Sequence, residues 1–119
     1  INASLGISQV KKLSHFLKLK RKIFKKFNSI IKKSKDIYIL NEPENCKSNF
    51  WLQTIVINNS SKSKRDKLLK KFHKNKILAR PVWKPLHKLK YLDKYPKMNL
   101  ANAKVIENSV INIPSSYYL

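Results

Sequence analysis

Hydrophobic positions in the first third of the chain recur at a helical interval. From Val10 to Ile31, apolar residues follow one another at steps of three, four and seven, with lysines between them. This spacing predicts one long amphipathic helix over residues 3–33. Its basic face would suit an anionic membrane surface or a partner that binds basic helices, but the wide apolar stripe favours packing against a folded domain.

Shorter apolar runs after this helix predict a small sheet, because they are rich in aromatic and β-branched residues. They lie at residues 36–40, 50–57, 77–82 and 110–113. Pro81 indicates that the third run is an edge strand or ends early, since proline has no backbone N–H to donate within a central strand.

Two further helices are predicted between these strands. Ser63 followed by Asp66 resembles a capping box, and Asn75 would end that helix in a left-handed turn. The other helix covers residues 99–109. Its buried positions would be Leu100, Ala103 and Ile106. Residues 83–98 contain two prolines and should be mostly loop.

The predicted order is helix, strand, strand, helix, strand, loop, helix, strand. Short strands with helices between them indicate an α+β fold, in which a long N-terminal helix precedes a small antiparallel or mixed sheet covered by helices. Residues 1–34 would form the long helix and residues 35–119 the α+β unit.

Charge changes the picture less than its size suggests. The 119 residues hold 27 Lys and Arg against 6 Asp and Glu, a net charge of +21. All but three of the basic residues are lysines, and they are spread along the chain, which favours a solvated surface over a specific nucleic-acid face. A stand-alone basic module that binds nucleic acid or an anionic membrane surface stays open as an alternative. We expect no membrane span, because no apolar run approaches about 18 residues.

The residues that carry chemistry do not form a self-contained active site. The single Cys46 excludes an internal disulfide and a cysteine zinc cluster, and it favours a reducing, cytoplasmic setting. His15, His73 and His87 are too far apart in sequence to suggest a metal site. Gly6 is the only glycine, so no glycine-rich phosphate loop is possible. We therefore predict no catalytic residue and no metal ligand in this chain.

One short segment differs from the rest. Arg80, Trp83 and His87 fall within eight residues that also hold two prolines, and proline stiffens the backbone that displays them. Arginine suits a phosphate or carboxylate, tryptophan stacks on a base or sugar, and histidine can bond to a hydroxyl. The same pattern is equally compatible with a packing corner in which Trp83 lies in the core.

Four stretches together carry a family resemblance. They are Asn2–Gln9 (NASLGISQ), Lys64–Leu69 (KRDKLL), Ala79–His87 (ARPVWKPLH) and Asn112–Ser116 (NIPSS). In this order they resemble the C-terminal region of the DegT/DnrJ/StrS sugar-nucleotide aminotransferases, and the last two resemble the subgroup of legionaminic-acid-type pathways. Asn75-Lys76 stands where that family usually has Asn-Gly.

The resemblance implies the C-terminal domain of a fold-type-I enzyme that uses pyridoxal phosphate. Such enzymes transfer an amino group, typically from glutamate, to the 4-keto carbon of a nucleotide-linked 6-deoxyhexose, and they are typically homodimers. The N-terminal domain, which would carry the Schiff-base lysine and most cofactor contacts, is absent here. The chain begins at Ile1, within the predicted helix. We therefore expect a fragment that is not a catalyst by itself.

The resemblance also suggests roles for particular residues. Arg80, Trp83 and His87 would line the sugar-nucleotide side of the cleft. Asn2, Gly6 and Gln9 would have a structural role, holding the long helix near the domain junction.

Overall fold

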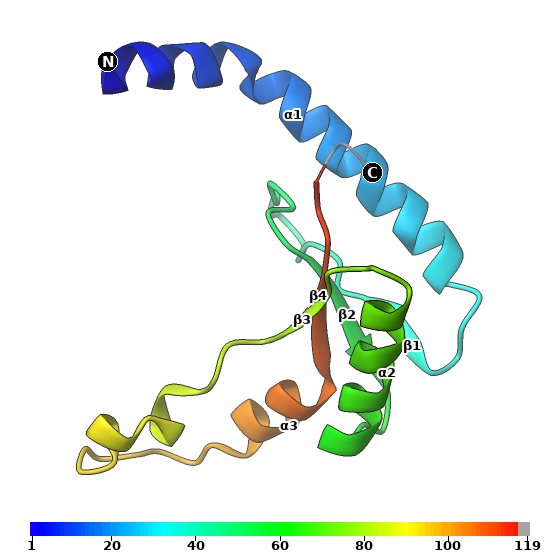
Figure 1. Cartoon of the computed structure of the whole chain (residues 1–119), viewed down its shortest axis with the longest axis vertical. Helices are drawn as coiled ribbons and strands as arrows, with labels where there is room; N and C mark the ends of the chain where they lie inside the picture. The colour runs from blue at the N-terminus through cyan, green and yellow to red at the C-terminus, as the bar shows by residue number, and fades with distance from the viewer. Residues whose placement is uncertain (117–119) are drawn as a thin grey trace.

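The computed structural model describes residues 1–116. Its elements follow the predicted order and are drawn in Figure 1. They are α1 (Asn2–Ile31), β1 (Ile37–Ile39), β2 (Gln53–Ile57), α2 (Lys62–Lys74), β3 (Arg80–Pro81), the 3₁₀ turns η1 (Leu86–Lys88) and η2 (Lys90–Leu92), α3 (Ala101–Ser109) and β4 (Val110–Ile113). The α+β prediction is confirmed.

The four strands form one antiparallel sheet in the order β1-β2-β4-β3. Ile55 pairs with Ile39 on one side and with Ile111 on the other, so these three side chains share one face. β3 is an edge strand, as Pro81 predicted, but it is shorter than the predicted run 77–82. Before it, Ala79 donates its backbone N–H to Ile77 O in a tight turn and not to a neighbouring strand.

One face of the sheet carries the hydrophobic core. The buried cluster consists of Phe24, Ile31, Ile39, Phe50, Ile55, Ile57, Ala79, Ile111 and Ile113. Phe24 and Ile31 come from α1, and half-buried residues of α2 such as Leu68 and Phe72 pack against the same cluster. Both helices therefore cover the apolar side of the sheet, which confirms the predicted layering.

Only the second half of α1 takes part in this packing. Residues 1–15 are all exposed, including the apolar Leu5, Val10 and Leu13. Figure 1 shows the N-terminal part of α1 extending beyond the sheet without a neighbouring element. The predicted apolar stripe is thus covered along part of its length by the described chain.

β2 begins later than its sequence predicts. The expected strand 50–57 starts at Gln53, because Phe50 has a left-handed φ of 48° that no strand residue adopts. Local side chains hold this turn: Phe50 N–H donates to Ser48 Oγ at 3.0 Å, and Trp51 N–H donates to Asn49 Oδ1 at 2.9 Å. These bonds compete with strand pairing.

The predicted caps of α2 are each displaced. Ser61, not Ser63, caps the helix, by accepting a bond from Lys64 N–H at 3.3 Å. Asp66 does not close a capping box, since Arg65 holds its carboxylate at 2.7 Å. At the other end, Asn75 has φ −91°, and the left-handed residue is Lys76 with φ 60°.

Lys76→Gly is expected to raise the free energy of unfolding by about 1 kcal/mol, because glycine adopts this φ without the steric cost that a Cβ brings. Urea unfolding followed by circular dichroism measures the change. Lys70→Gly is the matched control: it lies inside α2 and is exposed, so glycine should cost about 0.5–1 kcal/mol there. A loss of stability in Lys76→Gly would contradict the backbone assignment.

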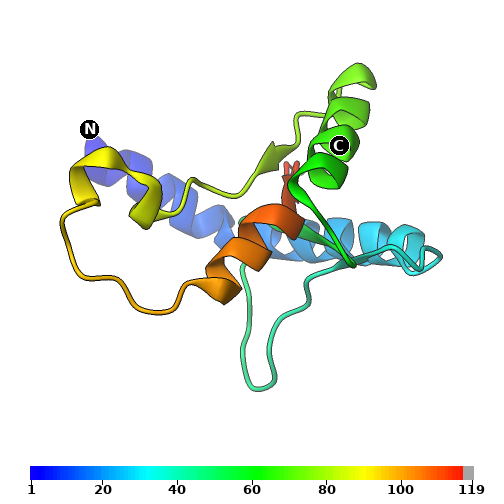
Figure 2. The ribbon, with the colours of Figure 1, turned by 90° about the horizontal axis from the view of Figure 1, so that it is seen from below.

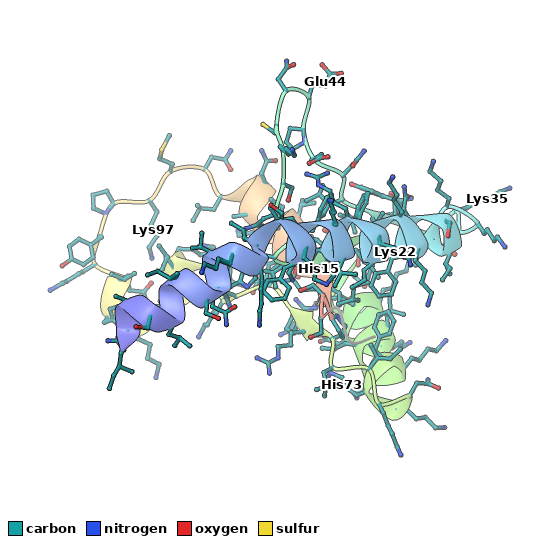
Figure 3. All side chains as sticks on the ribbon, turned by 90° about the horizontal axis from the view of Figure 1, so that it is seen from above. His15, Lys22, Lys35, Glu44, His73 and Lys97 are labelled. Atoms are coloured by element: carbon teal, nitrogen blue, oxygen red, sulfur yellow. The ribbon has the colours of Figure 1, made fainter. Side chains whose placement is uncertain are left out.

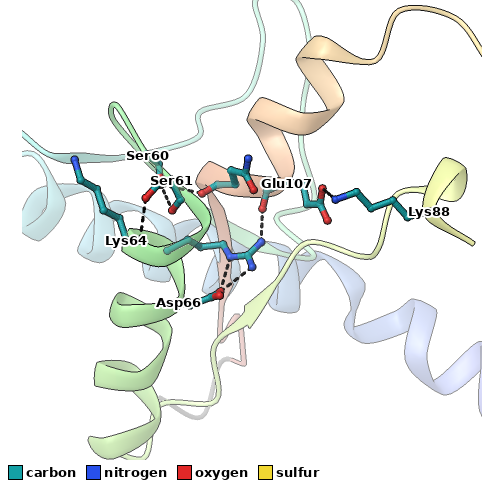
Figure 4. A network of polar contacts seen from close by, with 8 residues as sticks. Ser60, Ser61, Lys64, Asp66, Lys88 and Glu107 are labelled. Carbon is teal, nitrogen blue, oxygen red and sulfur yellow. Dashed lines mark hydrogen bonds and ion pairs between the residues drawn. The ribbon is translucent and has the colours of Figure 1, made fainter.

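α3 is joined to α2 by polar contacts and not by the apolar residue we predicted. Ile106 is 53% exposed, which corrects its expected burial. Figure 4 shows the bonds that replace it: the guanidinium of the buried Arg65 donates to Glu107 O, and Ser60 Oγ donates to Asn108 O at 2.8 Å. The position of α3 therefore depends on Arg65.

Candidate functional site

Arg80 begins the segment that the sequence singled out. It lies on β3 opposite Asn112 of β4, at the edge of the sheet, and its side chain is exposed. Among residues 1–116 the guanidinium has neither a hydrogen bond nor an ion pair. A positive group held on an edge strand and left free is available to an anionic ligand.

Trp83 is exposed, so the packing-corner alternative is wrong for this chain. Its side chain is 79% exposed, and the centre of its ring lies 6.3 Å from that of Trp51 at an interplanar angle of 55°. No role is predicted for Trp51 from the sequence, because it falls within the expected strand 50–57. The only sequence feature that could have linked Trp51 to Trp83 is that they are the two tryptophans of the chain.

His87 lies on η1 and is half-buried. Its Nε2 is buried and has no hydrogen-bond partner among the described residues. The pKa of Glu107 is lowered mainly by its hydrogen bond to Lys88, 2.5 Å away, and to a lesser degree by His87. His87 thus lies on the turn that also carries Lys88, the partner of Glu107, and no ring contact in the described part of the chain joins it to Trp83.

Asn2, Gly6 and Gln9 lie in the exposed first turns of α1. A Cβ added to Gly6 would meet no atom within 4 Å. Within the described chain nothing packs on these residues, so they are not brought together with Arg80, Trp83 and His87 by any contact of this structure.

The loop between β1 and β2 projects from the body of the molecule, as Figure 2 shows, and α1 anchors its base. Arg21 forms a bidentate pair with Glu42 at 2.9 and 3.2 Å and donates to Ser48 O at 2.7 Å. The hydrogen bond from Arg21, followed by that from Ser48 N–H, lowers the pKa of Glu42 below its ordinary value of 4.5. The Arg21 guanidinium also lies 5.1 Å from the ring centre of Phe50.

This anchor predicts a loss of stability in acid. A carboxyl whose pKa is lower in the folded state stabilises the fold above its unfolded pKa, and the contribution disappears as the pH falls through the folded value. The melting temperature should therefore fall between about pH 5 and pH 3, and Glu42→Gln should reduce that fall while lowering stability at neutral pH. Glu44→Gln, at the exposed tip labelled in Figure 3, should keep the wild-type profile. Equal profiles for the two variants would contradict the assignment.

Neither a buried lysine nor a cluster of metal-ligating side chains is found within residues 1–116. No lysine among them is buried, and only Lys20 is half-buried, with its Nζ donating to Ser115 O at 3.0 Å. Two surface hollows, of about 280 and 400 Å³, lie open to solvent and are lined by neither a carboxylate nor a buried lysine. Residues 1–116 contain no group of three metal-ligating side chains, and the labelled His15 and His73 in Figure 3 lie on separate helices.

The structure is thus an α+β unit with the exposed Arg80–Trp83 segment at one edge of its sheet. The sequence matches the DegT/DnrJ/EryC1/StrS aminotransferase family over residues 1–119, and the chain belongs to that family. No curated protein sequence matches it. Among residues 1–116, no helix has the length and apolar character needed to cross a membrane.

Solved structures share this fold at low sequence identity. The aminotransferase TlmJ from Streptoalloteichus hindustanus superposes with a TM-score of 0.86 at 17% identity, over 98% of this chain and 31% of its own. PseC from Helicobacter pylori, an aminotransferase involved in the biosynthesis of pseudoaminic acid, has a TM-score of 0.82 at 23% identity, over 92% of this chain and 30% of its own. The putative sugar aminotransferase Spr1654 from Streptococcus pneumoniae, in its PMP form, has a TM-score of 0.85 at 22% identity, over 98% of this chain and 30% of its own. The chain thus spans about a third of the length of these proteins.

Proposed function

We propose that this chain is the C-terminal domain of a pyridoxal-phosphate-dependent sugar aminotransferase, with residues 1–34 as its connecting helix and residues 35–119 as its small domain. The observation that supports this is a family match along the whole sequence, in a chain that covers only about 30% of its structural neighbours. The complete protein would transfer an amino group from glutamate to the 4-keto carbon of a nucleotide-linked 6-deoxyhexose, in the cytoplasm and as a homodimer.

The cofactor would be bound mainly by the part of the protein that precedes this chain. We therefore expect the 119-residue chain to be inactive by itself. The exposed apolar residues of the first half of α1 are suited to contact with the cofactor domain.

Arg80, Trp83 and His87 would serve the substrate and not the chemistry of the cofactor. Arg80 is a free cation suited to the diphosphate, and Trp83 presents an exposed aromatic face suited to stacking. The half-buried His87 would hold a substrate hydroxyl or the loop that carries Trp83. Asn2, Gly6 and Gln9 would lie at the junction with the cofactor domain, where the single glycine of the chain permits close approach.

Reconstitution tests this function. The chain is mixed or co-expressed with the cofactor-binding region of the complete protein, and amino transfer from glutamate to a nucleotide-linked 4-keto-6-deoxyhexose is measured together with the visible absorbance of bound pyridoxal phosphate. Activity should appear only when both parts are present. Folded, associated material that binds no cofactor and transfers no amino group would refute the proposal, and activity of the chain alone would refute the division of roles.

A further inference from the structure

The two tryptophans of this chain meet although 31 residues separate them in sequence. Trp51 is 62% exposed, Trp83 is 79% exposed, and their ring centres lie 6.3 Å apart. Large aromatic side chains are normally buried when they meet, because apolar area in water is unfavourable. Because the two rings are inclined at 55°, an exposed pair of this kind is suited to a flat ligand that stacks on one ring and meets the other with its edge.

Trp51 reaches this position only because the backbone breaks the strand pattern at Phe50. In β2, Gln53, Ile55 and Ile57 point to the buried face. A regular extension of the strand would therefore bury Trp51 and expose Phe50, since side chains alternate. The left-handed φ of 48° at Phe50 reverses the two: Phe50 is 5% exposed and stacks on Phe24, and Trp51 faces solvent. Such strain at a bulky residue is typical of functional positions.

The backbone of Trp51 is held from both sides. Its N–H donates to Asn49 Oδ1 at 2.9 Å, and its carbonyl accepts a bond from Ser115 Oγ. Lys20 of α1 in turn donates to Ser115 O at 3.0 Å. The local turn and the distant Ser115, itself bound by Lys20, thus hold the backbone of Trp51 in place before any ligand binds, which lowers the entropy lost on binding.

Positive charge flanks this aromatic pair. Arg80 and Lys84 lie three residues before and one residue after Trp83, and both are exposed. A nucleoside diphosphate combines a flat base with an anionic diphosphate, so its chemistry matches exposed aromatic rings beside cations.

We propose that Trp51 and Trp83 together form an aromatic platform for the nucleobase of a nucleoside diphosphate, in which the base stacks on one ring and meets the other with its edge, with Trp51 as a second binding residue. The inference rests on the proposed function for the identity of the ligand class, and it assigns the base end of that ligand. Arg80 would hold the diphosphate.

Tryptophan fluorescence tests the platform directly, because every tryptophan of the chain belongs to it. The 119-residue chain is titrated with UDP and with GDP at fixed salt, and inorganic pyrophosphate serves as a probe with charge and no base. At least one nucleotide should quench the emission in a saturable way, and pyrophosphate should not. Trp51→Leu and Trp83→Leu should each raise the Kd about tenfold or more, as loss of one stacked ring predicts.

Conservative and distant variants separate stacking from folding. Trp51→Phe and Trp83→Phe keep a ring and should retain intermediate affinity, with unchanged helical circular dichroism. Tyr95→Leu removes another exposed aromatic residue and should leave the Kd unchanged. The platform would be overturned by an absence of quenching, by equal quenching with pyrophosphate, or by an unchanged Kd in Trp51→Leu. It would also be overturned if L-fucose, a free 6-deoxyhexose without a base, saturated the quenching in place of the nucleotides. The titration uses neither pyridoxal phosphate nor amino transfer, so its failure is distinct from failure of the proposed function.

Discussion

Ile111→Ala is expected to lower the free energy of unfolding by about 2–5 kcal/mol, because it leaves a cavity in the centre of the sheet. Ile111 is 0% exposed and pairs with Ile55 of β2 on one side and Pro81 of β3 on the other. β4 is thus the strand that joins both halves of the sheet. A loss of this size is a large fraction of the stability of a small domain, so much of the variant should be unfolded at 37 °C.

The matched control is Ile106→Ala, which makes the same change on the neighbouring α3. Ile106 is more than half exposed, so its truncation should alter stability by no more than about 0.5 kcal/mol. Urea unfolding followed by circular dichroism compares the two variants at equal protein concentration. Similar losses in both would mean that α3 buries Ile106 in solution and that the arrangement of α3 described above is wrong.

Trp83→Ala in the complete enzyme should reduce kcat/KM for the nucleotide-linked sugar by well over tenfold, on the order of 1.4 kcal/mol or more. The reason is that an exposed ring stacked on the substrate loses its whole contact when truncated, whereas its removal leaves no cavity in the core. Because Trp83 would bind the ligand and not move a proton, the change should fall mainly on KM. Steady-state kinetics with varied nucleotide-sugar concentration measures this division.

Tyr91→Ala provides a control from the same proline-containing segment, residues 83–98. Tyr91 lies on η2 and is largely exposed, but it has no ring contact with either tryptophan among the described residues. It should retain near-normal kinetics. Unchanged kinetics in Trp83→Ala would instead show that Trp83 packs against the rest of the protein.

Local periodicity was enough to predict most elements. The 3.6-residue spacing from Val10 to Ile31 predicted α1, and the β-branched run at residues 110–113 predicted β4 with its observed bounds. Such patterns work because each element must bury one face. They failed where side chains of the loop compete for backbone donors, as Ser48 and Asn49 do before β2, because apolar content alone does not report those bonds.

The candidate site was found only in part. Arg80, Trp83 and His87 could be singled out because they lie close together in one proline-containing segment. Trp51 could not, since its contact with Trp83 joins residues on either side of α2 and depends on the left-handed Phe50. Nothing in a local window predicts that a bulky residue will adopt that φ.

The sequence by itself determined the class of fold, the family and the order of the elements, because these follow from the spacing of apolar residues and from short motifs read along the chain. Tertiary structure alone decided which side chains face outward together. That outcome depends on contacts between segments distant in sequence: Phe50 stacks on Phe24 in the core, and Ser115 holds the backbone of Trp51. Because Phe50 packs inward, the neighbouring Trp51 is left exposed, and its ring comes to lie beside that of Trp83.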